Sequence, residues 1–205
     1  MKKRILPIPL ILLIPIVMLV VVTVAGVYRF SLSDEEIMAK FPSQQQQMDP
    51  VLKSVFSISS PNPWTIEVPE VRAFSFINQF DADKQIASGR YDAGAERGSV
   101  LINTQWLTQV TENDYVSTLA VSNQGSGEFY YAAHFYYDQA LKRMVLKESE
   151  FLGDRISLTL LSLEGDQIRF EYLAHDKNDA MSSVPTQKQI RNFILSQQGR
   201  LQAAE

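Results

Sequence analysis

The chain of 205 residues contains no cysteine. This absence excludes a disulfide framework, thiol catalysis, a cysteine-based zinc site and a lipidated N-terminal cysteine. A domain exported from the cytoplasm must therefore be held together by its own hydrophobic core. The part of the chain that follows the N-terminal apolar run is long enough for such a core, since about 100 to 150 residues suffice.

Clustered cations and catalytic motifs are also missing. The net charge is −4, and Lys and Arg gather only at residues 2–4. Because phosphates are neutralised by clustered Lys and Arg, we expect no nucleic-acid partner. The chain has two histidines, His134 and His175, and lacks a His-Glu-x-x-His pattern, a Gly-x-Ser-x-Gly elbow and a Walker loop. We therefore expect no catalytic residue, no metal, no cofactor and no enzymatic activity.

The N-terminus carries one long hydrophobic run. Residues 5–27 contain no charge, and an apolar run above about 18 residues is a candidate membrane span. Positive flanks stay in the cytoplasm, so residues 2–4 orient the chain. We expect residues 1–30 to form a retained signal anchor in a bacterial inner membrane, with the following domain in the periplasm. The alternative is secretion after cleavage near residues 23–25, although a signal-peptide core is typically only about 7–15 residues long.

The remaining chain divides by composition. We expect residues 31–72 to hold a short helix at about 34–41, a polar linker, and an extended proline-rich segment anchored by a buried Trp64. Strand patterns dominate residues 73–196, which we expect to form the β-rich domain. Residues 197–205 are predicted to be a flexible tail.

Two hairpins define the fold class. Residues 114–122 and 128–138 alternate in hydrophobicity on either side of a Gly-rich turn, and residues 156–163 and 167–173 alternate around Glu-Gly-Asp. Residues 141–152 fit a strand or a helix, and we favour a strand. The sequence thus predicts a mainly β domain, possibly α+β, built of antiparallel hairpins and preceded by one N-terminal transmembrane helix.

The strand "EFYYAAHFYYD" is aromatic on both faces. Alternation along a strand puts Tyr130, His134 and Tyr136 on one face. If this row is exposed, it suits a protein partner or the rings of a glycan, and we predict these three residues as the binding surface. The alternative is a central strand that is covered on both sides.

A polar cluster lies at the open end of the second hairpin. It contains Asp154, Arg155, Asp176 and Asp179. A hard cation takes several oxygens, usually from one compact loop, whereas these acids belong to two separate loops. We therefore expect a loop-fixing role, in which Arg155 forms an ion pair with Asp176 or Asp179, rather than a binding site.

Four pieces in order carry a resemblance to a known domain: "GRYDAGAERGSV", "DYVSTLAVSNQGSGEFYYAAHFYY", "FLGDRISLTLLSLEGDQIRFEYL" and "DAMSSVPTQ". Residues 76–187 resemble an uncharacterised β-rich domain of bacterial secreted proteins and lipoproteins. Such domains carry a Gly-Ser-Gly hairpin, a Leu-Gly-Asp-Arg turn and an Asp-x-Met-x-x-x-Pro loop, which match residues 125–127, 152–155 and 179–185. The resemblance implies an envelope location and a β-rich fold, and it implies no activity.

These observations lead to one expected function and two alternatives. We expect a membrane-anchored periplasmic interaction module that is not catalytic and whose partner is another envelope protein. The first alternative is a domain that binds glycan or peptidoglycan. A hydrolase built on Asp154, His175 and Asp176 is the less favoured alternative, since acid–base chemistry requires these groups to come within hydrogen-bond reach.

Overall fold

The structure is a computed structural model, and it describes residues 10–31, 48–176, 179–196 and 200–204. The chain forms two units, Met1–Gln47 and Met48–Glu205. The first unit contains helix α1, Leu10–Ser31, with Pro15 inside it. Among the residues that the structure describes, no helix combines the length and the apolar character needed to cross a membrane. The predicted helix at 34–41 lies outside the described residues.

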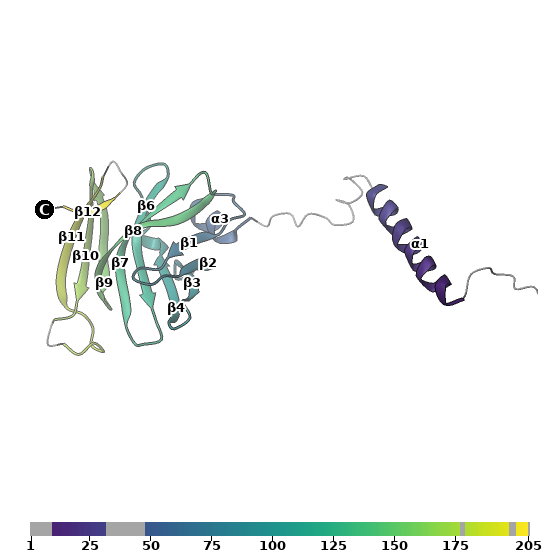
Figure 1. The fold of residues 1–205 in the computed structure, drawn as a ribbon. Coiled ribbons are helices and arrows are strands. Elements are labelled where there is room, and N and C mark those ends of the chain that lie inside the picture. Colours follow the sequence, from purple (N-terminus) through teal and green to yellow (C-terminus); the bar gives the residue numbers. More distant parts are fainter. Residues whose placement is uncertain (1–9, 32–47, 177–178, 197–199, 205) are drawn as a thin grey trace, which may run out of the picture. The chain divides into compact units, whose positions relative to one another are not determined.

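The second unit is built around a closed β-barrel (Figure 1). Its strands follow the order β4-β3-β2-β1-β8-β7-β6, and a β4–β6 pairing closes the ring. Neighbouring strands pair antiparallel, except that β1 and β8 run parallel and pair at Thr65↔Val145. The barrel strands are β1 Trp64–Glu67, β2 Phe74–Asp81, β3 Ile86–Asp92, β4 Arg97–Asn103, β6 Asp114–Ser122, β7 Glu128–Asp138 and β8 Arg143–Asp154, with the short β5, Thr108–Gln109, beside β6.

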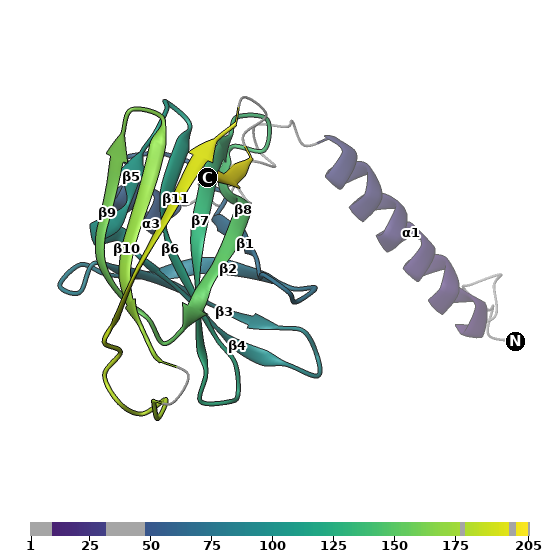
Figure 2. The ribbon, with the colours of Figure 1, turned by 90° about the vertical axis from the view of Figure 1, so that its left-hand side faces the viewer.

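A second antiparallel sheet packs on the outside of this barrel. Its order is β12-β11-β10-β9, and Figures 1 and 2 show it standing beside β6 and β7. The stacking buries one face of each sheet, which is the usual reason why a half-apolar sheet recruits a second layer. The strands are β9 Ser157–Glu164, β10 Gln167–Ala174, β11 Gln187–Leu195 and β12 Leu201–Ala203.

The barrel interior is the first hydrophobic core. Trp64, with none of its surface exposed, packs edge-to-face against Phe135 and Phe56, with ring centroids 5.0 Å and 4.8 Å away. Phe56 belongs to helix α3, Pro50–Phe56, whose N-cap Asp49 accepts a hydrogen bond from the Leu52 N–H at 2.8 Å. The helix therefore places its apolar side chains against the same core.

The second core lies between the barrel and the second sheet. Alternation along β7 sends Phe129, Tyr131 and Phe135 into the barrel and the even-numbered residues out of it. Ala132 thereby reaches the second sheet, where it meets Phe170 and Phe193, whose rings are 5.6 Å apart. The strand is thus covered on both sides.

The mainly β fold class is confirmed, and both predicted hairpins are present as β6–β7 and β9–β10. Residues 141–152 fall mostly in strand β8, as favoured. Two segments differ from the prediction. The compact unit begins at Met48 rather than at residue 73, because α3 and β1 contribute to the first core. The predicted flexible tail contains β12, which pairs with β11 and buries Leu201.

Candidate functional site

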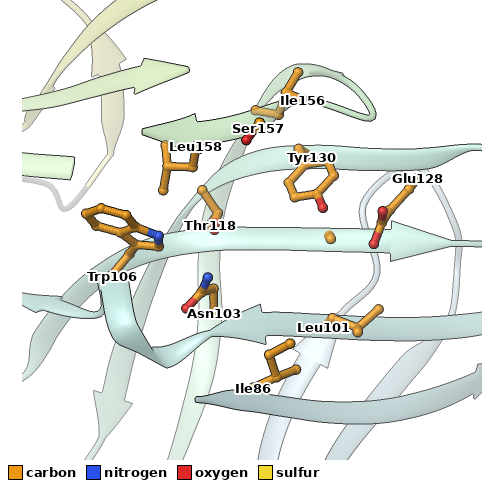
Figure 3. A pocket seen from close by; sticks show the side chains of 11 residues that line it. Ile86, Leu101, Asn103, Trp106, Thr118, Glu128, Tyr130, Ile156, Ser157 and Leu158 are labelled. Atoms are coloured by element: carbon orange, nitrogen blue, oxygen red, sulfur yellow. The ribbon is translucent and has the colours of Figure 1, made fainter. Parts of the chain in front are cut away.

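A hollow lies between the barrel and the start of β9. Its volume is about 250 Å³, and Figure 3 shows its lining side chains converging from β3, β4, β6, β7 and β9. Apolar side chains alternate in it with hydroxyl, amide and carboxyl groups, which is the composition typical of ligand sites. We call this hollow the cleft, and its lining is Ile86, Leu101, Asn103, Trp106, Thr118, Ala120, Glu128, Tyr130, Ile156, Ser157 and Leu158.

Tyr130 and Glu128 form one end of the cleft. Both point out of the barrel from β7, two residues apart on the same face. Burial, followed by the charge of Glu128 and a hydrogen bond to its carboxylate, raises the pKa of Tyr130 to about 12. The Tyr130 hydroxyl therefore stays protonated at neutral pH, where it is a hydrogen-bond donor beside an acceptor.

Trp106 and Asn103 lie toward the other end (Figure 3). Trp106 sits on the 3₁₀ helix η1, Thr104–Trp106, which follows directly after β4. Asn103 caps this helix: its Oδ1 accepts a hydrogen bond from the Gln105 N–H at 3.0 Å. The cap fixes the turn that carries the indole ring, so an aromatic face is held beside an amide group.

The turn between β8 and β9 forms a wall of the cleft between these two ends. The Glu128 N–H donates to Asp154 Oδ1 at 2.9 Å, and the Arg155 N–H donates to the Glu128 carbonyl at 2.8 Å. Arg155 adopts a left-handed conformation, with φ of 49°. These contacts clamp the turn onto β7, so that Ile156 and Ser157 stand at a fixed position across from Tyr130.

Within the predicted polar cluster, Arg155 contacts the loop through bonds other than the expected ion pair. The Arg155 guanidinium donates from Nη1 to the Met181 carbonyl at 2.9 Å and from Nε to the Ser126 carbonyl at 2.9 Å. Its ion-pair partner among the described residues is Asp154, at 3.9 Å. Asp179 Oδ2 instead accepts a hydrogen bond from the Asp176 N–H, and the Asp179 N–H donates to the Asp176 carbonyl, each at 3.1 Å. The predicted pairing of Arg155 with Asp176 or Asp179 is therefore wrong.

The predicted aromatic row does not form one exposed surface. His134 is fully buried, and its Nε2 lies 2.7 Å from Asp114 Oδ1. Tyr130 is half-buried against the second core and lines the cleft, whereas Tyr136 faces a separate hollow, with Lys147 Nζ 4.8 Å from its ring centroid. The expectation of an exposed row is thus corrected at His134, and the strand is covered on both faces over residues 131–135.

The sequence patterns do not identify several residues of the cleft. Asn103 and Trp106 are close in sequence, but Ser157 joins them only when the second sheet docks against the barrel. The sequence is sufficient to predict one contact, between Asp114 and His134. The β6–β7 register pairs Val116 with His134, which brings Asp114 within reach of the imidazole. A hairpin register predicts such diagonal neighbours.

Among the described residues, no hydrogen bond joins the His175 ring to Asp154 or Asp176. Within the described part of the chain, neither ring nitrogen of His175 has a hydrogen-bond partner, and Asp154 is bonded to the Glu128 backbone. The described residues also contain no group of three or more His, Asp or Glu side chains able to hold a metal ion. The cleft offers shape, aromatic faces and hydrogen bonds, which suit binding.

Comparison with known proteins finds no match, whether to a family model, a curated protein or a solved structure. The resemblance to an uncharacterised envelope domain therefore stays a prediction.

Proposed function

We propose that the protein is a membrane-anchored binding module of a bacterial envelope, facing the periplasm and acting without catalysis. The observation that carries the proposal is the cleft, where Trp106 and Tyr130 stand with Asn103, Glu128 and Ser157 around a hollow of about 250 Å³. Apolar walls with a few convergent polar groups are the usual form of a ligand site.

The anchoring part of the proposal rests on the sequence. The uncharged run covers residues 5–27 and follows three cations, so its orientation is N-terminus inward. Helix α1 begins at Leu10, and residues 5–9 of the run lie outside the described part of the chain. Secretion after cleavage near residues 23–25 is the competing proposal.

The binding part rests on how rigidly the cleft is built. Its walls come from the closed barrel and from a turn that two hydrogen bonds clamp to β7. A site held on such a framework needs little reorganisation when it receives a ligand, which favours affinity. The expected ligand belongs to another envelope component, either a protein or the cell-wall glycan.

Site-specific photocrosslinking tests the binding part. A photoreactive residue replaces Ser157, which is exposed at the cleft, in the full-length protein within its own cells. The matched control carries the same residue at the exposed Asp83, in the β2–β3 turn. We expect a crosslinked envelope component from position 157 only; equal products from both positions, or none from either, would contradict a binding cleft.

Cell fractionation tests the anchoring part independently. We expect the full-length protein in the inner-membrane fraction, with its C-terminal domain digested by protease in spheroplasts but not in intact cells. Recovery of a shortened chain from the soluble periplasmic fraction would instead support cleavage near residues 23–25.

A further inference from the structure

The cleft continues across the outer face of the barrel. Strand register aligns one outward-facing residue from each of five neighbouring strands in a row: Gln79, Ser88, Leu101, Ala120 and Tyr130. Leu101 lines both the cleft and a second hollow of about 580 Å³ over β2, β3 and β4. Five strands at their usual spacing of about 4.8 Å make this row about 20 Å long.

A parallel row lies next to the first. It consists of Phe76, Arg90, Ser99, Ser122 and Glu128. Four residues between the ends of the rows are small, namely Ser88, Ser99, Ala120 and Ser122, and the hydroxyls of Ser99 and Ser122 lie 2.8 Å apart. Leu101 and Arg90 are the larger side chains between the ends, and the two hollows meet at Leu101, so the two rows together form a shallow trough. We use the word trough for these ten residues.

A β-bulge adds hydrogen-bonding groups to the β2 end of the trough. The register of β2 against β3 shifts between Ile77 and Gln79, so Asn78 is the extra residue. Both Asn78 and Gln79 are exposed, whereas regular alternation would turn one of them inward. Two consecutive amides therefore lie on the outer face, beside Ser88 in the second hollow.

Exposed aromatic rings accompany these amides. Phe76 is 51% exposed, and its neighbour on the same face of β2, Phe74, is 60% exposed. Large apolar side chains that remain exposed next to one another are a feature of binding surfaces. With Tyr130 at the opposite end, the trough has an aromatic face at each end and hydroxyls and amides between them, which matches the alternating apolar faces and hydroxyl edges of sugar rings.

The charge of the trough further limits the class of ligand that it can bind. Arg90 is its single cation, and within the described residues it forms no ion pair, whereas nearby Arg97 is bound to Asp92 at 2.9 Å. A polyphosphate chain requires clustered cations, which these ten residues lack. Glu128 is the single anion of the ten residues and lies three strands away from Arg90, on β7. The groups that neighbour Arg90 in the trough are neutral, so its guanidinium complements a carboxylate that occurs at intervals along a chain.

The backbone argues against a peptide as the occupant. Peptides commonly bind a β-domain by pairing with a free strand edge. Each of the five strands beneath the trough has a neighbour on both sides, so none offers such an edge. A ligand of the trough must therefore be bound by side chains alone. A polymer with hydroxyl groups along its length can be bound in this way.

We propose that the trough binds a linear polysaccharide bearing carboxylate groups. Phe76 and Tyr130 stack on sugar rings, the amides of Asn78 and Gln79 bond to ring hydroxyls, and Arg90 pairs with a carboxylate. This inference rests on the proposed function, because it names the ligand class of a site that includes the cleft.

Co-sedimentation with purified peptidoglycan sacculi, whose peptide stems carry carboxylates, tests the proposal. The full-length protein in detergent is compared with F76A and R90Q, and with the matched controls F151A and R97Q, which change an exposed Phe and an exposed Arg outside the trough. We expect F76A and R90Q each to weaken binding about fivefold or more, since truncating an anchor residue typically costs more than about 1 kcal/mol. The controls should bind as the wild type does, and thermal unfolding of each variant checks that it is folded at the temperature of the assay.

The alternative results separate the two proposals. Equal binding by F76A, R90Q and their controls, or equally tight binding to an uncharged linear glucan, would overturn the inference. A protein crosslinked from position 157, together with no sedimentation on sacculi, would also overturn it while supporting the proposed binding function. Failure of both experiments would overturn both proposals.

Discussion

His134 Nε2 and Asp114 Oδ1 lie 2.7 Å apart across the β6–β7 hairpin, beneath the second sheet. The other carboxylate oxygen of Asp114 accepts a hydrogen bond from the Thr111 hydroxyl, and the Asp114 N–H donates to Thr111 Oγ1 at 3.2 Å. The histidine is fully buried, so this pair joins a buried polar group to the turn before β6. Such a contact stabilises the fold and explains a histidine in an apolar setting.

The first prediction concerns this pair. D114A should lower the free energy of unfolding by about 1–3 kcal/mol, because it removes a hydrogen-bond acceptor from a buried side chain. Urea unfolding of the full-length protein measures the effect. The matched control is D166A, at an exposed position in the β9–β10 turn, which should change the free energy by about 0.5 kcal/mol or less. Equal effects from both variants would contradict a stabilising role for the pair.

The second prediction concerns Arg155. R155Q removes the bonds from the guanidinium to the Ser126 and Met181 carbonyls, so the segment 179–185 should exchange its amide hydrogens faster. Hydrogen exchange read by mass spectrometry measures this. R97Q, which breaks an exposed ion pair, is the control and should leave that segment unchanged. Unaltered exchange at 179–185 in R155Q would show that Arg155 does not hold the loop.

The third prediction concerns the C-terminal strand. Leu201 is 3% exposed in the second core, and its N–H donates to Glu148 of β8. L201A should cost about 2 kcal/mol or more in the free energy of unfolding. Q202A, at the next and exposed position, should be nearly neutral. If L201A were also neutral, residues 201–203 would behave as the flexible tail that the sequence predicts.

The fourth prediction concerns alkaline pH. Burial, with the nearby carboxylates of Glu96, Glu128 and Glu70 respectively, raises the pKa of Tyr91, Tyr130 and Tyr131 to about 12. The unfolded value is about 10, so the folded state favours the neutral phenols. Their stabilising contribution is complete below pH 10 and is lost as the pH rises toward 12. Urea midpoints should therefore fall across this range; a constant midpoint up to pH 12 would contradict the raised values.

Local patterns were sufficient to predict the hairpins. Alternation over residues 114–122 and 128–138, together with the Gly-rich turn between them, specifies β6 and β7 without knowledge of the rest. The same patterns assigned Tyr130, His134 and Tyr136 to one face correctly, since side chains alternate along a strand. They do not say what covers that face. The cover is the second sheet, whose core residues, such as Phe170 and Phe193, lie far from β7 in the chain.

The remaining features depend on closure of the barrel. Strand β1 lies among prolines and has four residues, so its burial comes from neighbours on β2 and β8 and not from its own pattern. The cleft joins residues from Ile86 to Leu158. The acceptors of Arg155 are backbone carbonyls, which every residue carries, so residue identity alone favoured the charged partners Asp176 and Asp179.

The most direct test of a binding function for the cleft is to block it. S157W places a large side chain at an exposed position on its wall, and Q189W places the same side chain on an exposed position of β11. The full-length variants are crosslinked in their own cells, and the captured envelope components are quantified by mass spectrometry. We predict that S157W reduces capture about tenfold or more while Q189W matches the wild type; equal capture by S157W and the wild type would contradict a binding function for the cleft.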